Sequence, residues 1–108
     1  MIVMRYVVAL AVAPGLALAA ATSDFDRGYE LAETKGCLEC HALSYRDIGP
    51  SFRSVAETYR DDPSYRARLP RIIRGGSAGH WGERFVMWPQ PQLTDEQMRL
   101  LVDWILSQ

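Results

Sequence analysis

The chain has 108 residues, of which 48% are hydrophobic and 23% are charged, and its formal net charge is −1. This is the composition of one globular domain, because the apolar share is too high for a disordered chain and the length is too short for two domains. The near-neutral charge argues against a nucleic-acid-binding protein, which needs a basic surface to neutralise phosphates.

The first 21 residues have the layout of a secretory signal peptide. Arg5 gives a short basic start, residues 6–13 form an apolar run, and alanines near the end of the segment supply the small residues of a cleavage site. The run is too short to indicate a membrane span, and an uncleaved anchor helix is the alternative. We therefore expect residues 1–21 to be removed and residues 22–108 to form the mature, exported domain.

Removal of 21 of the 108 residues leaves 87, which is near the lower limit for a single hydrophobic core. Small exported domains usually compensate with disulfides, a metal or a cofactor. Cys37 and Cys40 are the two cysteines of the chain, and a disulfide between them would close almost no loop and stabilise little. The size of the domain therefore predicts that a cofactor completes the core.

Four stretches of the mature chain are typical of helices. Residues 23–35 begin with an N-cap serine and end before a glycine stop signal, and residues 51–60 carry one apolar stripe. Residues 62–74 start with an aspartate–proline pair, and Pro70 predicts a break or a fresh start within them. Residues 94–107 open with a T-x-x-Q capping box and continue with an apolar stripe. These elements predict an all-α domain.

Residues 75–91, between the third and fourth predicted helices, contain four glycines and two prolines and cannot form a regular helix. A loop of this length in a small domain is usually functional or disordered. The apolar residues 85–88 argue against disorder. We therefore expect a loop that is ordered against something apolar.

Residues 37–41 read Cys-Leu-Glu-Cys-His, which is the C-x-x-C-H haem attachment sequence. Two thiols about one helical turn apart can each add to one vinyl group of the same porphyrin edge, and the adjacent His41 then projects its imidazole toward the iron. A zinc site would need two further ligands, and a thiol–disulfide oxidoreductase would place the cysteine pair after a strand. Neither pattern is present, so the motif predicts one covalent haem c on Cys37 and Cys40.

The second axial ligand has to come from Met87, Met98 or His80. Met98 lies on the apolar stripe of the last predicted helix, which is the pattern of a core residue. Met87 lies in the apolar part of the loop and is the favoured candidate, with a gap-filling loop methionine as the alternative. His80 lies among glycines and is expected to be an exposed loop residue. It stays a rival, because a bis-histidine site would have a lower reduction potential than a His/Met site.

The mature chain resembles the small monohaem bacterial class I cytochromes c. The matching segments keep the family's order and spacing and are Leu31-Ala32, Gly36-Cys37, Cys40-His41, Ile48-Gly49-Pro50, residues 72–77, Trp81-Gly82, Met87 and residues 103–107. The resemblance implies an all-α class I cytochrome c fold with about four helices around one covalently bound haem c. It further implies a soluble periplasmic one-electron carrier rather than an enzyme.

Carried over to this chain, the resemblance implies that His41 and Met87 are the axial pair and that the Pro50 carbonyl accepts a hydrogen bond from His41. It places Trp81 near a haem propionate. Arg74 either faces that propionate or is a solvated surface arginine.

The chain departs from the family's pattern in the loop before Met87, which has four residues after Gly82 where the family has three. Trp88 also replaces a proline there, and we expect its ring to pack within the loop rather than shield the methionine sulfur or meet a partner.

The implied partners are redox proteins, a reductase or an oxidase, with no small-molecule substrate at the iron, no nucleic acid, no stable membrane insertion after cleavage and a monomeric state. Residues 22–45 carry two basic and five acidic groups, whereas residues 46–84 carry eight basic and five acidic groups. This asymmetry favours an acidic partner surface, with an ordinary solvated face as the alternative. The alternative function is a haem c subunit of a larger periplasmic oxidoreductase, for example one that oxidises sulfite or sulfide.

Overall fold

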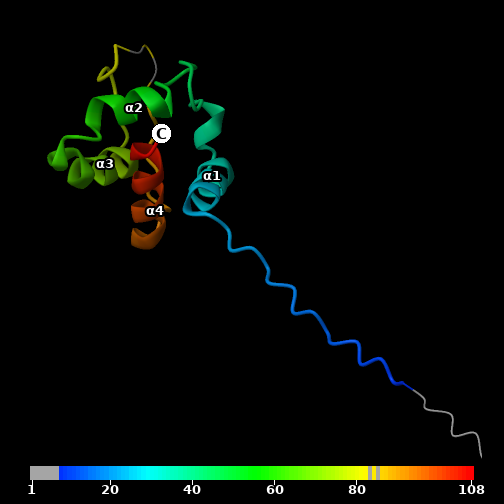
Figure 1. Cartoon of the computed structure of the whole chain (residues 1–108). Coiled ribbons are helices and arrows are strands. Elements are labelled where there is room, and N and C mark those ends of the chain that lie inside the picture. The colour runs from blue at the N-terminus through cyan, green and yellow to red at the C-terminus, as the bar shows by residue number, and fades with distance from the viewer. Residues whose placement is uncertain (1–7, 83, 85) are drawn as a thin grey trace, which may run out of the picture.

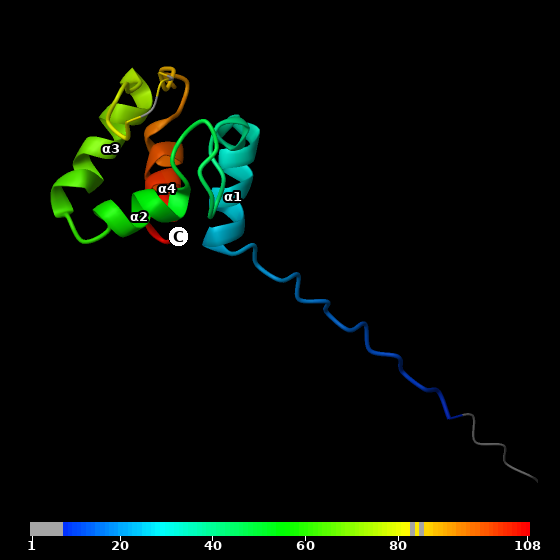
Figure 2. The same ribbon diagram turned by 90° about the horizontal axis from the view of Figure 1, so that it is seen from above.

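The computed structural model describes residues 8–82, 84 and 86–108, and Figure 1 shows them as a helical body with an extended N-terminal segment. Over this part of the chain the elements are α1 (Asp24–Thr34), the 3-10 turn η1 (Cys37–Glu39), α2 (Phe52–Tyr59), α3 (Pro63–Gly75) and α4 (Asp95–Leu106). α4 contacts all three other α-helices and lies between α1 and α3 in both views (Figures 1 and 2). The predicted all-α class is confirmed.

Residues 8–22 extend away from the helical body without regular structure, and their side chains are exposed (Figures 1 and 2). The basic start at Arg5 and the first residues of the apolar run lie outside the described residues. No helix among the residues that the structure describes is long and apolar enough to cross a membrane.

The predicted helix starts coincide with side-chain caps. The Ser23 Oγ accepts a hydrogen bond from the Asp26 N–H at 3.1 Å and begins α1. At α4, the Gln97 N–H donates to Thr94 Oγ1 at 3.1 Å, while the Thr94 N–H donates to the Gln97 side-chain oxygen at 3.0 Å. Such caps satisfy N–H groups that have no partner within the helix, which is why short local motifs predict helix starts well.

The predicted break at Pro70 is wrong, because α3 runs unbroken from Pro63 to Gly75 with Pro70 inside it. A proline in a helix interior removes one backbone hydrogen bond and costs roughly 3 kcal/mol. Leu69 and Ile73, one helical turn apart, are both 6% exposed. Full burial of each such side chain contributes about 1.5–3 kcal/mol. Their packing against the core therefore outweighs the local cost of the proline.

The packing of α1 against α4 depends on a missing side chain. A Cβ added to Gly28 would lie 2.3 Å from Trp104 Cγ, so the two helices approach closely only because residue 28 is glycine. Trp104 is 2% exposed and packs edge-on against Phe52, with ring centroids 4.9 Å apart. The close approach of Gly28 to Trp104 sets the position of α1. The turn that carries the two cysteines, η1, follows α1 directly and is called the cysteine turn below.

Candidate haem-binding site

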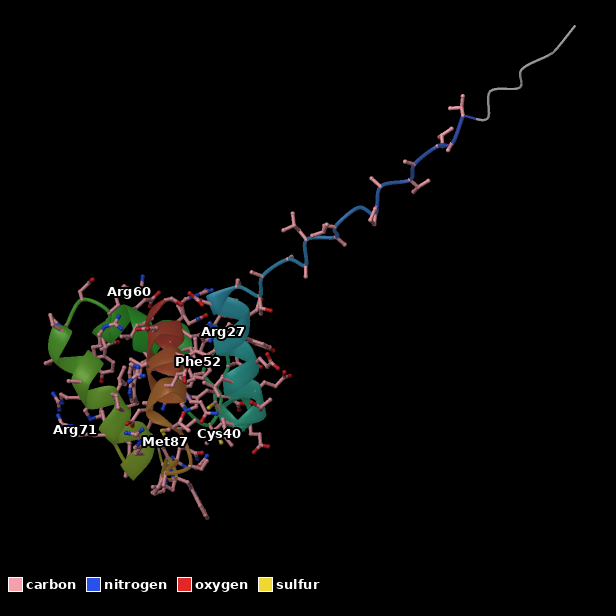
Figure 3. The ribbon with its side chains drawn as sticks, turned by 90° about the horizontal axis from the view of Figure 1, so that it is seen from below. Arg27, Cys40, Phe52, Arg60, Arg71 and Met87 are labelled. Atoms are coloured by element: carbon pink, nitrogen blue, oxygen red, sulfur yellow. The ribbon has the colours of Figure 1, made fainter. Side chains whose placement is uncertain are left out.

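One cavity of about 520 Å³ lies between the cysteine turn, α2, α3, α4 and the loop that precedes α4. Its walls are mainly apolar side chains such as Phe52, Leu69 and Ile73. All six site residues predicted from the sequence line it, and these are Cys37, Cys40, His41, Pro50, Trp81 and Met87. Figure 3 shows Cys40 and Met87 at the same end of the molecule. The fold therefore brings together residues that are up to 50 positions apart.

The cysteine turn begins at Gly36, whose φ of 79° ends α1 and starts η1. Cys37 and Cys40 both carry unpaired thiols. Burial raises the pKa of the Cys37 thiol above its ordinary value, so the thiol stays protonated at neutral pH. The His41 N–H donates to the Cys37 carbonyl oxygen at 3.0 Å, which fixes the histidine backbone to the same turn.

The imidazole of His41 is oriented by a hydrogen bond from its Nδ1 to the Pro50 carbonyl oxygen at 2.7 Å. A carbonyl only accepts, so Nδ1 carries the proton and Nε2 keeps its lone pair. The ring also stacks on Phe52, with centroids 5.2 Å apart. The Gly49 backbone also approaches the ring so closely that a Cβ there would lie 2.5 Å from His41 Cε1. The imidazole is thus held in the tautomer that a metal-ligating Nε2 requires.

The backbone of Met87 is paired with Ser77 across the loop. The Met87 N–H donates to the Ser77 carbonyl at 2.7 Å, and the Ser77 N–H donates to the Met87 carbonyl at 3.1 Å. The Gln90 N–H then donates to the Ile73 carbonyl at 2.9 Å and ties the loop to α3. These bonds place Met87 on the cavity wall. Two residues of this loop, Glu83 and Phe85, lie outside the described residues.

The two rival ligands have other surroundings. Met98 is 2% exposed within the hydrophobic core and is not among the described residues that line the cavity. His80 is exposed and does line the cavity, but its Nε2 is hydrogen-bonded to the Tyr59 hydroxyl at 3.0 Å and lies 3.4 Å from the Tyr65 hydroxyl. Met87 lines the cavity, and among the described residues its sulfur has no hydrogen-bond partner of the kind that His80 has. Of the three candidates, Met87 therefore has the donor atom that is most available to a metal in the cavity.

Two arginines have structural partners. Arg74 forms an ion pair with Asp95 at 2.7 Å and donates to the Leu93 carbonyl at 3.3 Å. It is not one of the described residues lining the cavity, so it anchors the start of α4 and neither faces the cavity nor is simply solvated. Arg46, which the sequence analysis did not single out, donates to the Trp81 carbonyl at 3.3 and 3.4 Å and connects two loops at the cavity.

The expectation that Trp88 packs within the loop is wrong, since the side chain is 79% exposed. The backbone is extended around Met87, and alternate side chains of an extended segment point to opposite sides. Met87 is half-buried, while its neighbours Val86 and Trp88 are exposed and line only the rim of the cavity.

Comparison with known proteins shows the family to which the chain belongs. The Cytochrome c family matches residues 25–108. Cytochrome c-551 of Azotobacter vinelandii is 32% identical over 82 residues, which cover 76% of this chain and 98% of that protein. The crystal structure of wild-type Nitrosomonas europaea cytochrome c552 superimposes with a TM-score of 0.68 at 33% identity, covering 73% of this chain and 96% of that one. The class 1 cytochrome MtoD from Sideroxydans lithotrophicus ES-1 gives a TM-score of 0.66 at 28% identity, covering 80% and 97%.

The fold and the family match define a small class I monohaem cytochrome c. The chain belongs to the cytochrome c family, whose members carry electrons on covalently bound haem c and exchange them with redox partners.

The residues present fit that cofactor. The cavity volume lies within the range of about 300–1,000 Å³ typical of pockets that bury ligands and cofactors. The donor set includes two thiols on one turn, an imidazole whose Nε2 keeps its lone pair, and a thioether. The apolar lining matches a porphyrin face, the two thiols can add to its vinyl groups, and an imidazole and a thioether suit the iron of a haem.

Proposed function

We propose that this protein is a periplasmic one-electron carrier, and not an enzyme, in which Cys37 and Cys40 hold haem c through thioethers while His41 and Met87 ligate the iron. The observation that carries this proposal is the 2.7 Å hydrogen bond from His41 Nδ1 to the Pro50 carbonyl, in a cavity that Met87 also lines. It leaves Nε2 as the metal-binding atom of a fixed imidazole and raises the basicity of that ligand.

The haem iron supplies the one-electron chemistry, and the protein sets the potential at which it operates. The thioether of Met87 is a soft, neutral ligand that favours the ferrous state, so a His/Met pair gives a higher potential than two histidines. The apolar cavity acts in the same direction, because a low dielectric penalises the extra charge of the ferric state. His41 and Met87 would together hold the iron, so the site would exchange electrons and would not bind a small-molecule substrate.

The route of export supports a periplasmic location. Residues 1–21 are the proposed signal peptide, and the part of this segment that the structure describes is extended and exposed. Cleavage leaves residues 22–108 as a monomeric carrier in the compartment where c-type haem is attached. The proposed N-terminus lies beside Ser23, the N-cap of α1, so cleavage would leave this cap in place, and the removed residues that the structure describes, 8–21, are exposed.

The rim of the cavity supplies the proposed docking surface. Ile48, Val86 and Trp88 are 45%, 59% and 79% exposed, and all three line the cavity. Trp88 thus offers a large apolar side chain to a partner at the edge where electrons leave. Electron-transfer complexes bury little area, so a small apolar patch with Arg46 hydrogen-bonded to the cavity-lining Trp81 suits a short-lived encounter with an acidic reductase or oxidase.

The experiment that tests the axial pair compares three variants of the holoprotein by absorption spectroscopy. The ferric protein should show the weak far-red band that an iron–sulfur bond gives. Met87→Ala should abolish the band, lower the potential and open the iron to cyanide or carbon monoxide. His80→Ala should keep the band, and so should Met98→Leu, which retains an apolar side chain of similar volume and costs under about 1.5 kcal/mol. A band that survives Met87→Ala and disappears in either other variant would overturn the proposed ligation.

A further inference from the structure

His80 is held at the cavity rim by two tyrosines from different helices. Its Nε2 lies 3.0 Å from the Tyr59 hydroxyl on α2 and 3.4 Å from the Tyr65 hydroxyl on α3. The two phenol rings are stacked with centroids 3.6 Å apart, and Trp81 packs edge-on against Tyr59 at 5.7 Å. The hydroxyls of Tyr59 and Tyr65, called the His80 cradle below, thus fix the imidazole beside the cofactor cavity.

The cradle can hold both protonation states of His80. Burial, with the adjacent Tyr65 contributing, raises the pKa of Tyr59 to about 12, so its hydroxyl keeps its proton at physiological pH. That hydroxyl can donate to the lone pair of a neutral imidazole, and after rotation it can accept from the N–H of an imidazolium. His80 therefore gains or loses a proton without leaving its position, and its exposure connects it directly to solvent.

From this geometry we propose that His80 is a redox-linked proton site, so that the protein takes up a proton when it is reduced and releases one when it is oxidised. The inference rests on the proposed haem c in the cavity that His80 lines. One electron reduces ferric to ferrous iron, and one proton from solvent binds to Nε2 of His80. The net charge of the site is then unchanged, whereas reduction without proton uptake would lower it by one unit.

The described groups around His80 do not themselves change charge with the redox state. Among the described residues, the groups that hydrogen-bond to His80 are the phenols of Tyr59 and Tyr65, and the raised pKa of Tyr59 keeps its hydroxyl protonated. Arg68 lies over the ring of Tyr65, 4.7 Å from its centroid, and it is a constant positive charge that does not change with the redox state. A unit charge change roughly 10 Å away, at an effective dielectric constant of about 20, alters the proton affinity of a group about tenfold. That distance is the scale of the cavity that His80 lines.

The test measures the reduction potential of the holoprotein from pH 5 to pH 8.5 together with His80→Gln, which keeps a neutral polar side chain. A tenfold change in proton affinity makes the potential at the acid plateau about 59 mV higher than at the alkaline plateau. Proton uptake on reduction, followed with an indicator dye in weakly buffered solution, should be a fraction of one proton per electron at the pH where the potential changes most steeply. His80→Gln should flatten the potential and abolish the uptake. Arg84→Gln is the control, because arginine is charged throughout this range and its loss shifts the potential equally at every pH.

Two outcomes overturn the coupling. One is a wild-type potential that does not vary with pH, and the other is a slope that persists unchanged in His80→Gln. The far-red band of the ferric protein distinguishes a failure of the proton site from a failure of the proposed ligation. If the wild type shows the band but its potential does not vary with pH, only the proton site is refuted. If the wild type shows no band, the His41/Met87 pair is refuted.

Discussion

Replacing Gly49 by alanine is the smallest change that perturbs the orientation of His41. The new Cβ would lie 2.5 Å from His41 Cε1 and 2.8 Å from Nδ1. Ordinary van der Waals contact begins at 3.4 Å, so the imidazole has to retreat by roughly 0.9 Å or the backbone has to shift by a similar amount. The ring cannot simply retreat, since Phe52 stacks on it and Nδ1 is bonded to the Pro50 carbonyl.

The expected cost follows from these contacts. Forcing an extra methyl group into packed surroundings costs typically about 1–3 kcal/mol. A retreat of the ring by the required amount would stretch its 2.7 Å hydrogen bond to the limit for such bonds, and losing it costs a further 0.5–1.5 kcal/mol or so. Gly49→Ala should therefore lower the free energy of unfolding of the holoprotein by about 2–4 kcal/mol. It should also alter the absorption spectrum of the haem, because the orientation and basicity of the imidazole change.

Guanidinium unfolding of the holoprotein measures the loss, with Gly75→Ala as the matched control. A Cβ at Gly75, the last residue of α3, meets nothing within 4 Å, and the backbone there is not left-handed. Gly75→Ala should leave stability unchanged or raise it by about 0.4–1 kcal/mol through the unfolded state. Equal stability and identical spectra for the two variants would refute the reasoning that residue 49 must be glycine for His41 to take its position.

Three further predictions concern the rest of the fold and its export. Gly28→Ala should destabilise the holoprotein by about 1–3 kcal/mol in the same unfolding assay, because its Cβ would lie 2.3 Å from Trp104 Cγ, and an unchanged midpoint would contradict the helix contact. Hydrogen bonds from Ser64 lower the pKa of Asp62 below 3.8, so its carboxylate stabilises α3 above that pH and loses this effect as the pH falls through the lowered value. The stability difference between the wild type and Asp62→Asn should accordingly be constant from pH 5 to 7 and shrink below about pH 4, whereas a pH-independent difference would count against it. Mass spectrometry of native periplasmic protein should show the loss of residues 1–21 or a cut one or two residues earlier, and gel filtration should give a monomer; co-elution with a catalytic chain would instead indicate an enzyme subunit.

Features encoded in short segments could be predicted from the sequence. The C-x-x-C-H motif predicts haem attachment from five consecutive residues. The caps of α1 and α4 each depend on residues three positions apart. The helical stripe that contains Met98 predicts a core residue, and the burial of Met98 in α4 confirms it. In each case the deciding interaction joins residues close together in the chain, so it can be predicted from the order of the residues.

Features that depend on contacts between distant segments could not be predicted. α3 continues through Pro70 because Leu69 and Ile73 are buried against other elements. The free energy of that burial depends on the tertiary structure and cannot be predicted from the neighbouring residues. The cradle of His80 brings residues 59 and 80 together across two helices and a loop, a separation that gives no periodic signal. Trp88 was expected to pack because it is large and apolar, whereas the extended backbone at Met87 turns it outward.

The two sides of the cavity are held by different kinds of interaction, and this bears on how the site works as an electron carrier. His41 is fixed by bonds within its own segment, to Cys37 and Pro50, together with close packing against Gly49. Met87 depends instead on a backbone pair with Ser77 at the two ends of a glycine-rich loop. A carrier gains speed when its ligands keep the same positions in both oxidation states, and the backbone pairing at Met87 restrains the proposed ligand from the loop before α4. The exposed side chains of that same segment form part of the rim, so the loop that holds the sulfur also presents the proposed contact surface to the partner.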